Sequence, residues 1–145
     1  MNSFPSDAVS SEVEKSQPWQ ILGAVLLAWW ISIRMLWNDW EIDSQYSYGF
    51  LVPILCMALF QMRWGDRPAQ APEEGVASVA LLAGFAVPLA LLPLIFEANP
   101  EWRVLGLLGA FSAIGFTLAL LRWMGGGAWE HHFLFPVTFF LIAVP

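Results

Sequence analysis

Residues 37–53 read WNDWEIDSQYSYGFLVP and separate two strongly apolar runs of the chain. The stretch combines two tryptophans, two tyrosines and three carboxylates with Pro53, which stands at the start of the second apolar run. A proline suits the first turn of a helix, because the N–H groups there have no hydrogen-bond partner within the helix and the one that proline lacks is not needed. The pattern predicts two helices joined by a polar, aromatic loop, and this loop is the first candidate for a working surface.

The composition indicates a membrane protein. Of the 145 residues, 58% are hydrophobic and 12% are charged, whereas soluble domains carry roughly 25% charged residues. The apolar residues fall in blocks of about 20, the length that a helix needs to cross a hydrocarbon core about 30 Å thick. We therefore expect an all-α fold, a polytopic transmembrane helix bundle, with the lipid bilayer as a partner.

The apolar runs also predict how the chain is divided. A polar N-terminal tail is expected over residues 1–17, and a transmembrane domain over residues 18–145. The acidic leader lacks a basic start and a small-residue cleavage site, so the first span should be retained. About four complete spans and a truncated fifth are expected, at residues 19–37, 50–64, 76–96, 104–121 and 133–145. Since the last run is short and no polar tail follows it, we expect this chain to be the N-terminal part of a longer protein.

The basic residues predict the orientation in the membrane. The N-terminal tail and the segments after the second and fourth spans hold four of the six: Lys15, Arg63, Arg67 and Arg122. The segments after the first and third spans hold Arg34 and Arg103. This bias favours a cytoplasmic N-terminus, which would put residues 37–53 at the outer face.

Several function classes find no support in the sequence. The net charge of −6 and the scattered basic residues argue against a nucleic-acid partner. No Asp, Glu or Lys lies near the middle of a predicted span, which argues against an ion-coupled transporter. We expect no cofactor, because the chain has no phosphate-binding glycine loop, and no metal site of the His-Glu-x-x-His type.

The acidic residues of the opening stretch allow two interpretations. Asp39, Glu41 and Asp43 alternate along the chain, and oxygen ligands at alternate positions can bind calcium, although a loop site needs more ligands. A solvated acidic loop is the favoured interpretation. The two tryptophans and two tyrosines of the stretch could stack on a substrate, but an interfacial aromatic belt is favoured.

Two further groups of residues could carry chemistry. Glu130, His131 and His132 precede the last apolar run; a polar interfacial cap is favoured over a metal-binding or proton-handling role, because adjacent histidines project in different directions from a helix. The only cysteine, Cys56, has the apolar neighbours Leu55 and Met57 and is expected to be a small buried hydrophobe. No complete catalytic constellation is present, and we predict no catalytic residue in this chain.

A short similarity links two of the apolar runs. Phe-Leu-x-Pro occurs at residues 50–53 and again at residues 133–136, each time at the start of a run. The expected topology puts these two helix starts on opposite sides of the membrane, as in an inverted repeat. Chance similarity of two helix starts is the favoured interpretation.

Residues 43–53, DSQYSYGFLVP, resemble a motif of the exosortase/archaeosortase family of multi-pass membrane transpeptidases. That family shows a Tyr-Ser-His-Gly-Phe-Leu-Val-Pro-like start to its second span, and Tyr48 stands here in place of the usual His. Residues 135–145, FPVTFFLIAVP, resemble a second family segment in a middle span. The order of the two matches fits the N-terminal half of the family.

The resemblance implies a protein-sorting enzyme in the bacterial cytoplasmic (inner) membrane. Such an enzyme would cleave C-terminal tripartite, PEP-CTERM-like sorting signals on exported proteins at the outer face, through a Cys acyl-enzyme assisted by Arg and His. Those catalytic residues belong to an Ala-Cys-Ser-Gly-like context and later positions, so Cys56 does not inherit the role. The resemblance offers six candidate residues for the substrate cleft or the family motif: Tyr46, Ser47, Tyr48, Gly49, Phe50 and Pro53. The alternative function is a non-enzymatic multi-pass membrane scaffold or assembly subunit.

Overall fold

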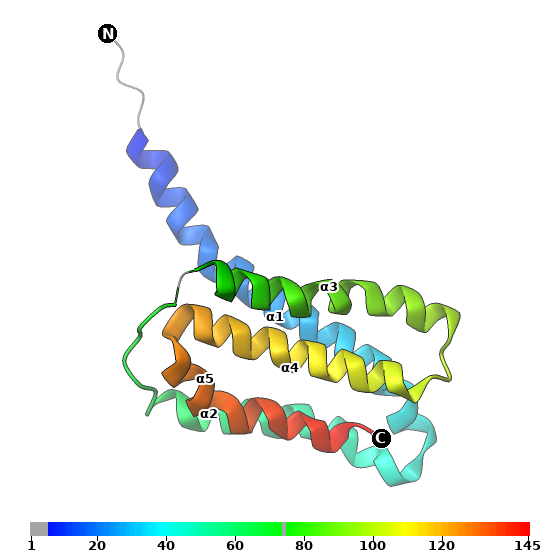
Figure 1. The fold of residues 1–145 in the computed structure, drawn as a ribbon. Coiled ribbons are helices and arrows are strands. Elements are labelled where there is room, and N and C mark those ends of the chain that lie inside the picture. Colours follow the sequence, from blue (N-terminus) through cyan, green and yellow to red (C-terminus); the bar gives the residue numbers. More distant parts are fainter. Residues whose placement is uncertain (1–5, 74) are drawn as a thin grey trace.

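The computed structural model describes residues 6–73 and 75–145, and over these ranges every regular element is helical. Figure 1 shows the elements in chain order. They are α1 (Ser6–Ile42), the 3₁₀ helix η1 (Ser44–Phe50), α2 (Val52–Trp64), α3 (Val76–Ala98), α4 (Arg103–Gly125), α5 (Gly127–Thr138) and the 3₁₀ helix η2 (Phe139–Ala143). The predicted all-α class is confirmed.

The helix α4 is the centre of the bundle, and α1, α3 and α5 all pack against it. Small residues make the close approach of α1 possible: a side chain at Gly106 would meet Leu36 Cδ2 at 2.8 Å, and one at Gly109 would meet Met35 Sδ at 3.1 Å. Ala110 and Ala113 complete the small-residue face and are fully buried. Two-thirds of the apolar part of α4 is buried inside the protein (67%), whereas the corresponding share of α3 is 11%.

The segment formed by α5 and η2 lies antiparallel to α2. Near the end of α2, Arg63 donates a hydrogen bond to the carbonyl oxygen of His132 at 2.8 Å. At the other end, Tyr48, just before α2, donates to the carbonyl oxygen of Ile142 at 3.2 Å. The two Phe-Leu-x-Pro sequences therefore lie at opposite ends of this pair of helices.

The bundle has two ends, a motif end and a linker end. The motif end carries η1, the turn between α3 and α4, and the end of η2; the linker end carries residues 65–73 and the turn between α4 and α5. At the linker end, Glu73 accepts hydrogen bonds from Arg122 Nε at 2.9 Å and from the Gly127 amide at 3.1 Å. The indole of Trp129 donates to the carbonyl oxygen of Pro68 at 2.8 Å. These contacts attach the linker to α4 and α5.

Three helical segments are long and apolar enough to cross a membrane: Trp19–Ile42, Val76–Ala98 and Arg103–Gly125. The prediction of four complete spans plus a fifth is not confirmed. At 1.5 Å per residue, the 13 residues of α2 extend about 20 Å, less than the hydrocarbon thickness of about 30 Å. The α5 helix, with 12 residues, is shorter still.

The helix ends also differ from the expected ones. The α1 helix continues to Ile42, so residues 37–42 are helical and the expected loop begins only at Asp43. Residues 122–132, which separated the last two predicted spans, are helical except for a break at Gly126. Its φ of 79° is the left-handed conformation that glycine adopts without a Cβ penalty. The α1 helix begins at Ser6 and so includes most of the polar 1–17 segment, of which residues 1–5 lie outside the described part.

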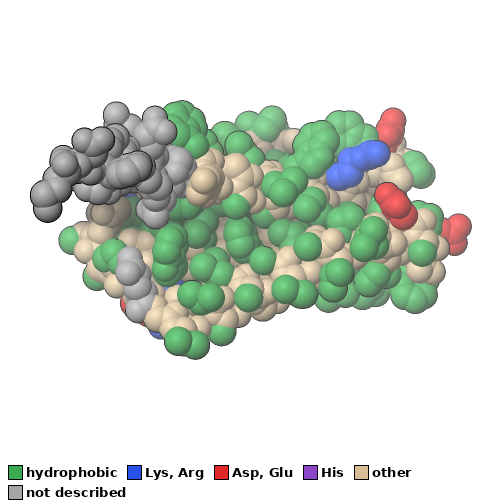
Figure 2. Space-filling model, turned by 90° about the horizontal axis from the view of Figure 1, so that it is seen from above, with side chains coloured by type: hydrophobic (Ala, Val, Ile, Leu, Met, Phe, Trp, Pro, Cys, Tyr) green, Lys and Arg blue, Asp and Glu red, His purple; other side chains and the backbone are tan. Residues whose placement is uncertain are grey.

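Most of the outer surface is apolar. Figure 2 shows one long face covered by hydrophobic side chains, with acidic and basic side chains gathered at one end. Large exposed side chains include Leu27, Val79, Leu91 and Leu94, each more than half exposed. In water such a surface would be costly. The apolar surface and the three long helices together identify a multi-pass membrane protein.

Candidate functional site

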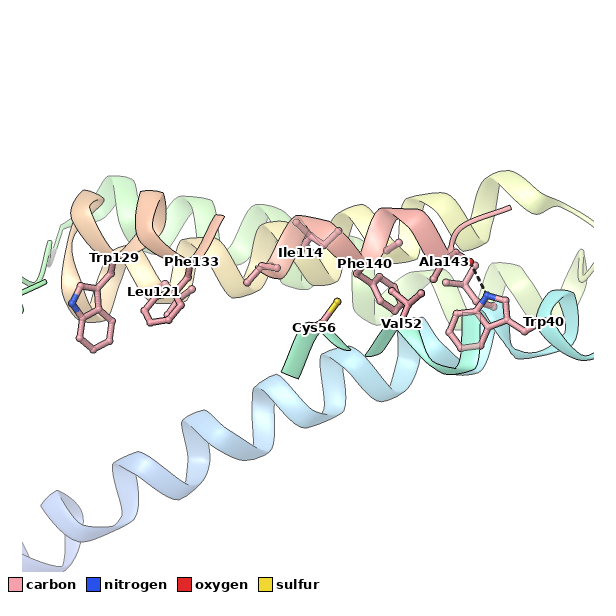
Figure 3. Close-up of a cluster of buried hydrophobic side chains, with 12 residues drawn as sticks. Trp40, Val52, Cys56, Ile114, Leu121, Trp129, Phe133, Phe140 and Ala143 are labelled. Atoms are coloured by element: carbon pink, nitrogen blue, oxygen red, sulfur yellow. Dashed lines mark hydrogen bonds between the residues drawn. The ribbon is translucent and has the colours of Figure 1, made fainter. Parts of the chain in front are cut away.

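The motif end is built around Trp40, in the last turn of α1. Its side chain is 1% exposed, and its Nε1 donates a hydrogen bond to the carbonyl oxygen of Ala143 at 2.7 Å (Figure 3). The ring also packs edge-on against Phe50 and Phe140, with centroid distances of 5.4 and 6.3 Å. One indole therefore connects the end of α1 with η1 and with the end of η2.

Gly49 lies directly against the indole of Trp40. A Cβ at this position would overlap Nε1 and the neighbouring ring carbons, and Gly49 is itself buried. Its φ is not in the left-handed region. The glycine of the motif is therefore required by close approach to a tryptophan, and not by an unusual backbone conformation.

The η1 turn is held by its own polar side chains. The Asp43 carboxylate accepts a hydrogen bond from the Gln45 amide at 3.0 Å and caps the turn. The Ser47 hydroxyl donates to the carbonyl oxygen of Ser44 at 3.0 Å. Tyr46 packs, half-buried, against the central hydrophobic cluster. Two polar side chains and one aromatic ring of the stretch thus shape the turn.

Two aromatic donors cap the end of η2. The carbonyl oxygens at the end of a helix have no partner within the helix. Here Tyr48 Oη donates a hydrogen bond to the carbonyl oxygen of Ile142, and Trp40 Nε1 donates one to the carbonyl oxygen of Ala143. Tyr48 is 45% exposed, so its ring forms part of the surface. The phenol of Tyr48 holds the end of η2 in place as a hydrogen-bond donor.

Phe50 and Pro53 form the start of α2. Phe50 is 38% exposed and packs edge-on against Trp37 at a centroid distance of 4.9 Å. Pro53 lies in the first turn of α2, as predicted from the sequence. All six candidate residues therefore lie within η1 or the first turn of α2. Sequence reasoning missed Trp40, which contacts two of them, Gly49 and Phe50.

Two of the three acidic residues of the stretch serve local structure. Glu41 accepts a hydrogen bond from Trp37 Nε1 at 3.2 Å, one turn earlier in α1. Asp43 is the cap of η1. Within residues 6–73 and 75–145, no group of three or more His, Cys, Asp or Glu side chains is arranged to hold a metal ion.

Glu130, His131 and His132 lie at the linker end, remote from the motif. Glu130 accepts from Arg122 at 3.2 Å, and His132 Nε2 is 2.9 Å from the carbonyl oxygen of Arg63. Since Arg63 donates to the His132 carbonyl in return, the pair closes the end of α2 onto α5. The contacts of Glu130 and His132 are thus structural, and the interfacial cap stays a prediction for the three residues.

Cys56 lies inside the hydrophobic core. Its side chain is 8% exposed and belongs to the cluster that includes Val52, Val137 and Phe140 (Figure 3). None of these neighbours can accept a proton or stabilise a thiolate, which a cysteine nucleophile needs. The described part of the motif end thus positions backbone and aromatic groups, and no nucleophile–base pair is found there.

A family model described as transmembrane exosortase matches residues 29–145. The matched range contains both motifs and their contacts through Trp40 and Tyr48. The comparison with curated proteins and the comparison with solved structures gave no match.

Proposed function

Because the chain belongs to the transmembrane exosortase family, we propose that it is the N-terminal membrane portion of a protein-sorting transpeptidase. The enzyme would cleave PEP-CTERM-like signals at the C-termini of exported proteins. One observation carries the proposal: the two segments that resemble the family, far apart in the sequence, meet at one end of the bundle. Tyr48 of the first donates a hydrogen bond to the Ile142 carbonyl oxygen of the second, and Trp40, which packs against Phe50, donates to that of Ala143. A shared site would account for the presence of both.

Some of the six motif residues would contact the substrate, and others would hold the site in shape. Tyr48 and Phe50 are exposed enough to contact a substrate peptide, and the exposed Ser47 lies beside them in the same turn. Gly49 and Pro53 would act indirectly: Gly49 lets η1 approach Trp40, and Pro53 starts α2. The buried half of the motif would thus hold the exposed half in position.

The bond-breaking chemistry belongs to other residues. The resemblance implies attack by a cysteine thiolate on the scissile peptide carbonyl. A histidine would give a proton to the peptide nitrogen as the C–N bond breaks, so that a thioester forms and the C-terminal fragment leaves as an amine. An acceptor nucleophile or water would then release the exported protein. An arginine would stabilise the oxyanion. Cys56 is enclosed by apolar side chains and has no part in this scheme.

The proposed orientation has the N-terminus in the cytoplasm and the motif end at the outer face of the inner membrane. Arg63, Arg67 and Arg122 lie at or beside the linker end, whereas Arg34 and Arg103 lie toward the motif end. Basic residues favour the cytoplasmic side. In this orientation the motif end would meet a substrate after its export.

The test is the processing of an exported protein with a tripartite C-terminal tail in the native host. Gly49→Leu at the chromosomal locus should cause the uncleaved form to accumulate, because a large side chain cannot share the position with Trp40. Gly84→Leu is the matched control, since a side chain there enters open space. Immunoblots measure the ratio of uncleaved to cleaved substrate, and they also show that the two variants are present in the membrane at equal levels.

If deletion of the gene leaves every tripartite-tail protein processed, the transpeptidase proposal is wrong. A non-enzymatic scaffold or assembly subunit would then be favoured, since the described residues contain no catalytic constellation of their own. If deletion blocks processing but Gly49→Leu does not, the enzyme class stands and the assigned role of the motif end fails.

A further inference from the structure

A second feature of the motif end lies on its side, between α1 and α3. A pocket of about 350 Å³ opens there. Its apolar wall includes Ile31, Met35 and Phe96, and three polar side chains also line it: Arg34, Asn38 and Glu97. None of the six cleft candidates of the motif contributes to it.

The pocket lies where two membrane spans end. The span in α1 ends at Ile42 and the span in α3 ends at Ala98. Glu97 is in the last turn of α3, and Arg34 and Asn38 lie in the last turns of α1. Figure 2 shows that the charged side chains on this face gather at one end of an apolar surface. The polar side of the pocket is therefore at the depth of the lipid headgroups, and its apolar side borders the acyl chains.

Arg34 and Glu97 have opposite charges and line one pocket without pairing. The described part of the chain has two ion pairs, and neither of them includes Arg34 or Glu97. The guanidinium nitrogens of Arg34 and the carboxylate oxygens of Glu97 are therefore more than 4.0 Å apart. The side-chain hydrogen bonds of residues 19–73 and 75–145 leave both groups without a protein partner. A ligand with a negative and a positive group could satisfy both charges at once.

We propose that this pocket binds one zwitterionic phospholipid, with a phosphate and an ammonium group in its headgroup. The guanidinium of Arg34 and the amide of Asn38 would hold the phosphate by charge-assisted hydrogen bonds. The carboxylate of Glu97 would hold the ammonium. The acyl chains would follow the apolar wall between α1 and α3.

The charge of the motif end favours this ligand over an anionic lipid. Besides Glu97, the end carries Glu101 in the α3–α4 turn and Asp39, Glu41 and Asp43 at the end of α1. Arg34 and Arg103 are the basic residues near them. A headgroup with a net negative charge would be repelled by these carboxylates, whereas an ammonium group compensates one of them. The apolar wall favours a lipid over a free phosphate ion, because only the lipid has acyl chains that can pack against the wall.

The test measures lipid binding by native mass spectrometry of the chain released from detergent micelles. Dioleoyl phosphatidylethanolamine should bind at one site about tenfold more tightly than dioleoyl phosphatidylglycerol. Arg34→Gln and Glu97→Gln should each lower the affinity for the zwitterionic lipid about tenfold. Arg103→Gln and Glu101→Gln are the matched controls, because they make the same charge changes at the same end outside the pocket, and they should have no effect.

Three results would overturn the proposal. Equal binding of both lipids, unchanged in all four variants, would mean adventitious annular lipid only. Loss of binding in Arg34→Gln but not in Glu97→Gln would mean recognition of phosphate alone. Competition by soluble phosphoethanolamine at the concentration at which the lipid binds would mean that the headgroup compound, and not the lipid, is the ligand.

Discussion

The indole Nε1 of Trp40 lies 2.7 Å from the carbonyl oxygen of Ala143 and donates a hydrogen bond to it across 103 positions of sequence. Both groups are buried, with exposed fractions of 1% and 0%. A buried carbonyl that loses its donor keeps the cost of its desolvation. This bond therefore connects the end of α1 with the end of η2, and the same indole connects both with η1 through its contacts with Gly49 and Phe50.

Replacing Trp40 by Phe should destabilise the protein by about 1–3 kcal/mol, since the ring is largely kept while the Ala143 carbonyl loses its partner. The measurement is unfolding in mixed micelles with increasing denaturing detergent. Trp37→Phe is the control: its indole is 42% exposed and donates to the exposed Glu41, so water can replace the bond. Equal loss of stability in both variants would contradict the role given to Trp40.

Gly49→Ala should be destabilising, by about 1–3 kcal/mol as for other overpacked sites, because the new methyl group overlaps the Trp40 indole. Gly84→Ala should have the opposite sign. It lies inside α3, where a Cβ meets nothing within 4 Å, and alanine is favoured over glycine in a helix by about 0.5–1 kcal/mol. The same detergent titration compares the pair, and a neutral Gly49→Ala would show that the close approach is relaxed.

The linker end should depend on pH through Glu73. Its hydrogen bonds from the Gly127 amide and then from Arg122 hold the pKa of this carboxyl below its usual range. Because the folded pKa is the lower one, the contribution of Glu73 to stability is complete above the ordinary glutamate pKa. It is lost as the pH falls through the lowered value.

Carbon-13 NMR of the Glu73 carboxyl group in micelles measures this pKa directly. Arg122→Gln should move it upward, toward the ordinary glutamate value, and the Gly127 amide should exchange faster with solvent. Arg103→Gln removes a positive charge at the other end of α4 and should leave both readouts unchanged. Titration of Glu73 at the ordinary value in the unaltered protein would contradict the proposed linker attachment.

The sequence predicted the parts of the fold that depend on local composition. Long apolar runs became α1, α3 and α4, and Pro53 starts α2 as expected. It failed where tertiary contacts decide the helix ends. Residues 122–132 separated two predicted spans, yet the chain breaks only at Gly126, where the Ala71 backbone approaches too closely for any side chain. The partner of Gly126 is 55 residues away, so no local pattern could reveal it.

The candidate site was predicted as a list of residues but not as an arrangement. The resemblance selected residues 43–53 and 135–145 separately, and the order of the motifs says nothing about their contact. The indole of Trp40 was assigned to an interfacial aromatic belt, although it is among the most buried side chains. Burial of a tryptophan at the end of a span depends on its partners Gly49 and Ala143, which are known only from the folded structure.

The orientation can be tested with reporter fusions. Alkaline phosphatase is active only outside the cytoplasm, so a fusion after Gln45, in η1, should be active. A fusion after Ala71, in the linker, should be inactive, since η1 and the linker lie at opposite ends of the bundle. A cytoplasmic reporter at the same two positions should give the reverse pattern. An inactive fusion at Gln45 with an active one at Ala71 would invert the proposed topology.

The final prediction concerns Cys56, the only cysteine in the sequence. Its sulfur packs among apolar side chains of α2, α5 and η2, without a base or an opening to solvent. Cys56→Ala should therefore leave the processing of tripartite-tail proteins within about twofold of normal and cost roughly 1 kcal/mol of stability, as for a small cavity. Loss of processing at a normal level of membrane-inserted protein would assign Cys56 the nucleophile's role, in contradiction to its enclosure. Gly49→Leu in the same strain background is the positive control, because it should block processing while Cys56 is intact.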